Sequence, residues 1–541
     1  MKILVIIPAR GGSKGIPRKN IRPMNGLPLI SYSIRTALES KYKPIVFVTT
    51  DDDEIAFFSK KFGAFVHKRQ KNLAQDSTTL DPVIIDAYKN IVNKLKLEFD
   101  LIITLQPTSP CLKTDSLDKA INKIVENEEI DTILSVKESK HLTWSNIGYK
   151  FKPNYIKRLN RQELQPIYQE TGGFLICKRN NISKGTRIGK NINIHILKDA
   201  ESIDIDNIDD WNICENNLKK KLIVFRVAGY KEIGLGHVYN TLLIANQILN
   251  HQILFLVDTK SNLAFNKIKE SNYKVIKQKK IDIADDIILL NPDIVINDCL
   301  DTTKLYIQKL KNNKIKVINF EDLGEGSKIA DFVFNPIYPK INSIKNQYFG
   351  HKYFCIRDEF SLHEKIRINT NIKNVVIAFG GTDPNNLSLK VLSSIHQYCQ
   401  NNSINIILIA GIGYTRFDKL KRFENIIVYK NIKNISDYFS IADIAFSACG
   451  RTIYELASLG IPTIVMGQNP REMTHYFASR NHGFLNLGLG INVNKKTILN
   501  SFTKLAVGFE ERKSMSKKML SFDLKNGKNR VVNIINKIIS K

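Results

Sequence analysis

The stretch that decides the fold is Ile7-Pro-Ala-Arg-Gly-Gly-Ser-Lys-Gly-Ile-Pro-Arg-Lys-Asn20. An apolar run ends at Ile7, and the loop beyond it carries three glycines, a serine and several cationic side chains. Glycines let successive backbone N–H groups converge on a phosphate, while Arg10 and Lys14 can neutralise a triphosphate. The spacing is neither that of a P-loop nor that of a Rossmann fingerprint. The stretch predicts a buried strand and a phosphate-binding turn, with a plain glycine-rich turn as the alternative.

A second informative stretch is Glu201-Ser-Ile-Asp-Ile-Asp206. Residues two apart in an extended chain point to the same side, so Asp204 and Asp206 would present paired carboxylates on one face. Ile203 and Ile205 would then face the other way, into a core. Two oxygen ligands on a rigid strand suit Mg²⁺, which keeps its other coordination sites for water and nucleotide phosphate. The residues alone leave a solvated edge strand open as the alternative.

Short apolar runs alternate with amphipathic helical stretches along the whole chain, which predicts an α/β architecture with mostly parallel sheets. In the first part we expect strands at 2–7, 45–49, 101–106, 132–136 and 174–177, and helices at 28–39, 80–96 and 116–127. Further strands are expected at 222–227, 253–257, 294–296, 315–320, 374–379 and 441–447. The predicted domains are 1–218, 219–365 and 366–541.

The composition excludes several classes of protein. Of 541 residues, 43% are apolar and 9% aromatic, which is ordinary for globular protein. No apolar run is long enough to span a bilayer, and the first run has no cleavage site behind it, so it predicts a strand and not a signal peptide. The seven cysteines are scattered and form no CxxC pair, which disfavours a disulfide framework or zinc site and fits a reducing cytoplasm.

The formal net charge of +28 comes from lysines spread over the whole chain. A nucleic-acid binder would concentrate such charge, with interleaved aromatic residues or a recognisable module. We interpret the charge as solvated surface lysine, which also favours anionic substrates. A charge-driven nucleic-acid-binding scaffold is the rival from a different class, and it leaves the two N-terminal stretches unexplained.

Three glycine-containing turns follow strands in the second half: Ile233-Gly-Leu-Gly-His237, Phe379-Gly-Gly-Thr-Asp383 and Ser447-Ala-Cys-Gly-Arg-Thr-Ile-Tyr-Glu455. Glycines let a helix N-terminus approach an anion, and His237 can act as a base or hydrogen-bond donor near neutral pH. Glu455 lies one helical turn into its segment, where a carboxylate can take both ribose hydroxyls. Each turn alone is consistent with an ordinary strand-to-helix connection, but three on strand ends favour a nucleotide cleft.

Residues 1 to about 214 resemble the CMP-N-acylneuraminate synthetase family. The resemblance is carried, in the family's order, by residues 7–20, Gly26-Leu-Pro-Leu-Ile-Ser-Tyr-Ser-Ile, Leu105-Gln-Pro-Thr-Ser-Pro110 and Ser202-Ile-Asp-Ile-Asp206. It implies that the anomeric hydroxyl of a nonulosonic acid attacks the α-phosphate of CTP and releases pyrophosphate. Such chemistry depends on positioning and charge neutralisation more than on a protein nucleophile.

The same resemblance implies roles for individual residues. CTP would be held by Arg10, Gly12, Ser13, Lys14 and Asn20. Lys14 would act on the phosphates during catalysis, and Asp204 and Asp206 would be catalytic through a bound Mg²⁺. Gln106 would hydrogen-bond the sugar acid, and Arg161 would anchor its carboxylate through a bidentate pair.

One departure bears on the substrate. Where sialic-acid enzymes carry an Asn-Gly pair after the tyrosine, this chain has Tyr168-Gln-Glu-Thr-Gly-Gly173. An acid of the sialic, legionaminic or pseudaminic type therefore stays open.

Residues 222–541 resemble the UDP-sugar hydrolase of pseudaminic acid biosynthesis, a relative of two-domain (GT-B) glycosyltransferases. The three turns and Leu459-Gly-Ile-Pro462 carry this resemblance. It implies that His237 is catalytic and assists water attacking the anomeric carbon of a UDP-linked diacetamido sugar. The sugar nucleotide would be bound by Gly234, Gly236, His237, Gly381, Gly450, Arg451, Thr452 and Glu455.

This half also departs from its family. An aspartate near the first strand end is replaced by the run Arg226-Val-Ala-Gly229, and an arginine three residues past the histidine by Asn240. The stretch Gln468–His475 differs from the family's glutamine-containing loop. A hydrolase, a glycosyltransferase and a non-catalytic binding module therefore stay open. Overall we expect a bifunctional, cytoplasmic homo-oligomer that uses Mg²⁺, CTP, a nonulosonic acid and a UDP-linked amino sugar, without nucleic acid or membrane span.

Overall fold

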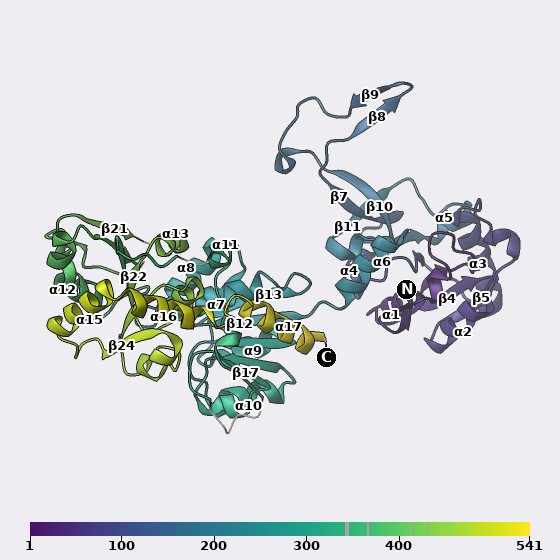
Figure 1. Cartoon of the computed structure of the whole chain (residues 1–541). Helices are drawn as coiled ribbons and strands as arrows, with labels where there is room; N and C mark the ends of the chain where they lie inside the picture. The colour runs from purple at the N-terminus through teal and green to yellow at the C-terminus, as the bar shows by residue number, and fades with distance from the viewer. Residues whose placement is uncertain (341–345, 365–366, 412, 431, 541) are drawn as a thin grey trace. The chain divides into compact units, whose positions relative to one another are not determined.

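The chain forms two compact units, Met1–Lys220 and Lys221–Lys541 (Figure 1). The computed structural model describes residues 1–340, 346–364, 367–411, 413–430 and 432–540. The predicted boundary between residues 365 and 366 lies outside the described residues. Within those ranges, no helix is both long and apolar enough to cross a membrane.

The first unit is built on a seven-stranded sheet of order β11-β7-β10-β6-β1-β4-β5. Only β10 runs antiparallel, to both of its neighbours, so the sheet is mostly parallel as predicted. The strands are β1 (Ile3–Pro8), β4 (Ile45–Thr50), β5 (Phe65–Lys68), β6 (Leu101–Leu105), β7 (Thr132–Ser139), β10 (Ile167–Lys178) and β11 (Ile192–Leu197).

Helices cover both faces of this sheet. The helices are α1 (Ile30–Leu38), α2 (Asp53–Lys61), α3 (Leu80–Leu95), α4 (Thr114–Glu126), α5 (Arg179–Ser183) and α6 (Ile208–Leu218). Alternate residues of β1 point to opposite faces, so Val5 lies in the core under α1 and α4, while Ile6 lies in the core under α3. Pro28 is not the first residue of a helix, because it belongs to the short pair β2 (Pro23–Met24) and β3 (Leu27–Pro28) that precedes α1.

A hairpin arm projects from the sheet of the first unit (Figure 1). It consists of β8 (Trp144–Ile147) and β9 (Lys150–Pro153), which form a separate two-stranded sheet between β7 and β10. Every residue of the two strands is exposed except Pro153.

The second unit begins with a seven-stranded, fully parallel sheet of order β14-β13-β12-β15-β16-β17-β18, here called the first lobe. Its strands are β12 (Leu222–Val227), β13 (Gln252–Val257), β14 (Val275–Lys277), β15 (Ile294–Asp298), β16 (Lys316–Phe320), β17 (Phe332–Asn335) and β18 (Gln347–Phe349). One face is covered by α7 (Gly236–Ala245) and α8 (Asn262–Glu270), the other by α9 (Ile283–Leu290) and α10 (Lys304–Asn312).

A six-stranded parallel sheet of order β21-β20-β19-β22-β23-β24 forms the second lobe. Its strands are β19 (Asn374–Ala378), β20 (Asn405–Ala410), β21 (Ile426–Lys430), β22 (Ile444–Ser447), β23 (Thr463–Gly467) and β24 (Phe484–Leu489). Its helices are α12 (Leu387–Asn401), α13 (Ile435–Ser440), α14 (Thr452–Leu459), α15 (Lys495–Val507) and α16 (Phe509–Leu520), with α11 (Glu359–Leu362) before the sheet. The predicted fold class, a mostly parallel α/β unit followed by a two-lobed GT-B-like module, is confirmed.

The last helix, α17 (Gly527–Ser540), packs in the first lobe and not in the second, where the domain prediction placed it. Its residues Val531 and Ile535 lie in the same core as Phe225 of β12 and Val238 of α7. The amphipathic spacing of α17 shows that one face must be buried, but spacing does not identify the sheet that buries it.

Candidate functional site

The two decisive stretches of the first unit contact each other directly. Lys19 donates a hydrogen bond from Nζ to the Ile205 carbonyl oxygen at 2.6 Å. A Cβ atom on Gly15 would come within 2.7 Å of the Asp206 carbonyl oxygen, so only glycine allows the loop to approach this closely. The cationic glycine loop and the aspartate segment are therefore walls of the same site.

The aspartate segment is not the predicted strand. Residues 203–206 form no regular element and connect a 3₁₀ turn, η4 (Asp199–Ser202), to α6. The alternation nevertheless holds, because Ile205 is fully buried in a small core, and its N–H donates to the Thr108 carbonyl at 2.9 Å. Asp206 is exposed and Asp204 half-buried.

The surroundings of Asp204 disfavour the ionised form of its carboxylate. Its Oδ1 atom is buried and has no hydrogen-bond partner among the described residues. Burial raises the pKa of the Asp204 carboxyl, and together with the charge of Asp206 it outweighs the side chain of Thr108, which lowers that pKa. A Cβ atom on Gly172 of β10 would come within 2.8 Å of this carboxylate, so the absence of a side chain there leaves it room. Oxygen donors in this state fit a hard divalent cation, which would favour their ionised form.

The predicted phosphate-binding cations are held by an acidic residue that the sequence analysis did not identify. Asp76 pairs with Arg10 Nη1 at 2.7 Å and with Lys14 Nζ at 2.5 Å. Hydrogen bonding to Lys14 in particular holds the pKa of the Asp76 carboxyl below its usual range. Asp76 thus pairs with the two cations that would bind a triphosphate. A bound triphosphate would compete with Asp76 for Arg10 and Lys14.

The other predicted CTP-binding residues of the glycine loop either hold its conformation or lie at its surface. Asn20 is buried and donates from Nδ2 to the Arg10 carbonyl at 2.9 Å, which fixes the shape of the loop. The Cβ direction of Gly12 is open, and Ser13 is half-buried.

The two predicted substrate-binding residues lie in different surroundings. Gln106 follows the carboxyl end of β6, and its backbone N–H donates to the Gly172 carbonyl at 3.3 Å, beside Asp204. Arg161 instead begins the exposed 3₁₀ turn η3 (Arg161–Glu163), between the arm and β10. No hydrogen bond or ion pair to Arg161 is seen in the described part of the chain, and its role in binding the acid stays a prediction.

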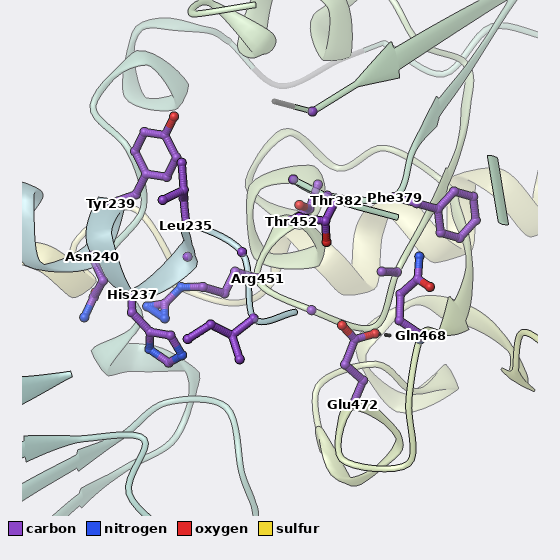
Figure 2. Close-up of a pocket in the computed structure, with 18 of the residues that line it drawn as sticks. Leu235, His237, Tyr239, Asn240, Phe379, Thr382, Arg451, Thr452, Gln468 and Glu472 are labelled. Atoms are coloured by element: carbon purple, nitrogen blue, oxygen red, sulfur yellow. Dashed lines mark hydrogen bonds between the residues drawn. The ribbon is translucent and has the colours of Figure 1, made fainter. Parts of the chain in front are cut away.

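In the second unit, a pocket of about 380 Å³ is lined by residues of both lobes (Figure 2). All eight residues predicted to bind the sugar nucleotide line it: Gly234, Gly236, His237, Gly381, Gly450, Arg451, Thr452 and Glu455. A Cβ atom on Gly236 would come within 2.8 Å of Arg451 Cδ, so the glycine of the first lobe allows the arginine of the second to approach.

His237 is fixed by a buried carboxylate. His237 Nδ1 lies 2.5 Å from Asp298 Oδ1, and Asn240 donates from Nδ2 to Asp298 Oδ2 at 2.7 Å. Asp298 is the last residue of β15 and pairs in register with Val227, the last residue of β12. Burial alone would lower the pKa of His237, but the charge and hydrogen bond of Asp298 outweigh it and raise that pKa.

A second buried ion pair joins the lobes beside this histidine. Arg451 donates from Nη1 to Glu321 Oε1 at 2.6 Å, and Glu321 follows β16 directly. Potential ligand atoms of His237, Asp298 and Glu321 lie within 4.8 Å of one another. Asp298 and Glu321 were not among the predicted site residues, although both follow strands of a parallel sheet at the edge where ligands bind.

The predicted ribose ligand Glu455 already has a partner. Arg357 donates to both of its oxygens, from Nε at 2.7 Å and from Nη2 at 3.0 Å. This bidentate pair orients the carboxylate while each oxygen keeps a further lone pair for a hydroxyl.

Comparison with known proteins agrees with the two-part organisation. A family model described as cytidylyltransferase matches residues 4–213. The pseudaminic acid cytidylyltransferase of Campylobacter jejuni is 36% identical over 32% of this chain and 77% of its own. The CMP-N,N'-diacetyllegionaminic acid synthase of Legionella pneumophila is 32% identical over 40% of this chain and 95% of its own. The chain therefore belongs to the cytidylyltransferase family.

A relative from Helicobacter pylori matches nearly the whole chain. It is named pseudaminic acid cytidylyltransferase and UDP-2,4-diacetamido-2,4,6-trideoxy-beta-L-altropyranose hydrolase, and is 25% identical over 94% of this chain and 95% of its own. Other relatives are matched over only part of their length: the chain spans from 50% to 64% of four of them, including N-acylneuraminate cytidylyltransferases of Danio rerio.

The buried pair of His237 and Asp298 makes a testable prediction. Replacing Asp298 by Asn removes the negative charge, so the pKa of His237 should fall. Because the folded-state pKa of His237 is raised, its protonation stabilises the fold below about pH 6.5, and this contribution is lost as the pH rises through the raised value. Asp298→Asn should reduce this low-pH stabilisation.

The measurement is an NMR titration of the histidine ring protons, with the His237 signal identified by its absence in His237→Gln. Asn240→Ala is the matched control, because it removes a neighbour of Asp298 but leaves the charge. An unchanged His237 pKa in Asp298→Asn would contradict the claim that Asp298 raises this pKa.

Proposed function

We propose that the first unit transfers CMP from CTP to a nonulosonic acid and releases pyrophosphate. The observation that carries this proposal is the direct contact between the cationic glycine loop and the aspartate segment, through Lys19 and the Ile205 carbonyl. The names of the Campylobacter and Legionella relatives support the substrate class. They differ in the acid named, and other relatives are N-acylneuraminate cytidylyltransferases, so the pseudaminic, legionaminic and sialic types are all candidates.

In this proposal the protein works by positioning. Arg10 and Lys14 leave Asp76 and bind the triphosphate, while Gln106 holds the sugar acid at the strand edge. The anomeric hydroxyl attacks the α-phosphate, the bond to the β-phosphate breaks, and pyrophosphate leaves. Asp204 and Asp206 would hold Mg²⁺, which neutralises phosphate charge when bound. The orphaned Oδ1 of Asp204 and the space beside Gly172 fit such an ion.

A pyrophosphate-release assay tests this reaction. The full chain with CTP, Mg²⁺ and a panel of nonulosonic acids should release pyrophosphate, and Asp204→Asn combined with Asp206→Asn should reduce the rate at least about 100-fold because charge neutralisation is lost. Asp209→Asn is the control, because it removes a nearby exposed carboxylate from the first turn of α6. Full activity in the double variant would refute the metal assignment, and no release with any acid would refute the reaction.

We further propose that the second unit hydrolyses a UDP-linked amino sugar. The supporting observation is that the eight predicted residues line one pocket in which His237 is fixed by Asp298. With Nδ1 bound to Asp298, the other ring nitrogen can take a proton from water as it attacks the anomeric carbon and UDP leaves. The raised pKa means that the basic form of His237 accumulates only at higher pH.

NMR of the full chain with UDP-2,4-diacetamido-2,4,6-trideoxy-β-L-altropyranose distinguishes the possible activities. Hydrolysis should yield free UDP and free sugar, with a rate that falls as the pH drops through the raised His237 pKa. His237→Ala should slow it about 100-fold or more, in the range of a lost general base. Turnover only with an added acceptor would indicate a glycosyltransferase, and binding without turnover would indicate a non-catalytic module; either result would refute hydrolysis.

We also propose that the first unit dimerises through its arm. The arm presents several exposed apolar side chains, among them Ile147 at 60% and Phe151 at 71% exposure. Apolar groups gathered on a projecting hairpin mark a contact surface. A symmetric contact through the arm would also place Arg161 against the second copy.

Light scattering after gel filtration tests the dimer. The chain should elute with twice its own mass, and Ile147→Glu with Phe151→Glu should convert it to monomer. Phe57→Glu, at an exposed apolar residue of α2 away from the arm, should leave the dimer intact. A monomeric parent chain, or a dimer that survives both arm substitutions, would refute the arm as the interface.

A further inference from the structure

The loop Gln468–His475 follows β23, and the cytidylyltransferase and hydrolase proposals leave its histidine without a role. His475 lines the pocket, and its Nδ1 lies 2.6 Å from the Cys449 carbonyl oxygen. A carbonyl can only accept, so Nδ1 carries the proton of the neutral ring. Cys449 precedes Gly450 and Arg451, so His475 is fixed against the same turn that supplies these two pocket residues.

The second ring nitrogen of His475 is an acceptor at neutral pH. Burial, with a smaller contribution from the charges of Arg451 and Arg471, lowers the pKa of His475 to about 4. The neutral ring therefore offers a lone pair at Nε2 and no proton there.

This acceptor is unused. His475 Nε2 is buried and finds no hydrogen-bond partner among the described residues. A buried polar atom left unpaired is destabilising, so one that lines a pocket indicates a ligand or water that completes it. Arg451 Nη2 is likewise buried and unpaired in the described part of the chain, and it is a donor. The same turn and loop therefore present one unused acceptor and one unused donor.

Arg451 lies at the His237 end of the pocket, and His475 contacts the turn that carries Arg451. Arg451 pairs with Glu321, whose carboxylate lies within 4.8 Å of a His237 ring nitrogen. The ring of His475 packs edge-on against Tyr338 of the first lobe, with centroids 4.9 Å apart.

We propose that His475 is a specificity-determining residue whose Nε2 accepts a hydrogen bond from the acetamido N–H next to the anomeric carbon of the bound sugar. The inference rests on the proposed hydrolase function and deepens it, by assigning a residue that recognises the acetamido group of the UDP-linked sugar. An acetamido group offers one N–H donor and one carbonyl acceptor, which match the unused acceptor of His475 and the unused donor of Arg451. The substrate named for the Helicobacter relative carries such a group at that carbon.

Two substitutions of His475 distinguish recognition of the sugar through Nε2 from a structural role through Nδ1. In His475→Asn, the side-chain amide N–H can replace Nδ1 toward the Cys449 carbonyl, while nothing replaces the Nε2 acceptor. In His475→Gln, the longer side chain can place an amide oxygen where Nε2 was. Thermal unfolding of both variants shows whether the loop remains folded.

Calorimetry of the full chain with UDP, UDP-glucose and UDP-N-acetylglucosamine gives the test, because the two sugars differ only at the carbon next to the anomeric one. The parent chain should prefer the acetamido sugar. His475→Asn should lose about tenfold of that preference, the size expected of one hydrogen bond to a buried acceptor, with UDP affinity unchanged. His475→Gln should keep most of it.

Three results would overturn the inference. Retained preference in His475→Asn would show that the acceptor is not used, and an equal loss for all three ligands would show a purely structural role. A parent chain that binds UDP but does not distinguish the sugars would refute the inference while the hydrolase proposal stands. A parent chain that binds no uridine nucleotide would refute both.

Discussion

The first unit depends on one close approach. The loop after β1 and the segment before α6 are separated by nearly two hundred residues, yet Lys19 and Gly15 bring them into contact at the Ile205 and Asp206 carbonyls. A larger side chain at Gly15 would separate them. Without this contact, the cations of the loop and the carboxylates of the segment would not share one site. No single site could then bind both the triphosphate and its metal ion.

The second unit uses the same physical arrangement in another form. Its site residues lie at the carboxyl ends of parallel strands, where the chain leaves the sheet and leads into the next helix. Asp298 and Glu321 follow neighbouring strands of the first lobe, and Arg451 meets them from the second. The two carboxylates and two basic groups balance in charge when His237 is protonated, which explains how such a cluster can be buried. Without Arg451 of the second lobe, the buried Glu321 of the first lobe would lose its ion pair.

The sequence could predict features that depend on local pattern. Apolar runs located the central strands of the three large sheets, among them β1, β12 and β19, but outer strands such as β5, β11 and β14 were not predicted. Glycine turns at strand ends pointed to both candidate sites. It could not locate partners that come from distant segments. Asp76 holds Arg10 and Lys14, and nothing in the spacing of residues 7–20 points to it. Asp298 holds His237, and only the register of β12 with β15 places this aspartate at the same sheet edge as the glycine turn that precedes His237. Arg161 was inferred from resemblance alone, and it lies on an exposed turn between the arm and β10.

The most direct measurement of the central claim is a crystal structure of the full chain soaked with CTP and Mn²⁺. The account predicts one anomalous peak between the carboxylates of Asp204 and Asp206 and the triphosphate, with Lys14 released from Asp76 onto the phosphates. A triphosphate bound away from the aspartates, or a metal with no contact to either carboxylate, would contradict it.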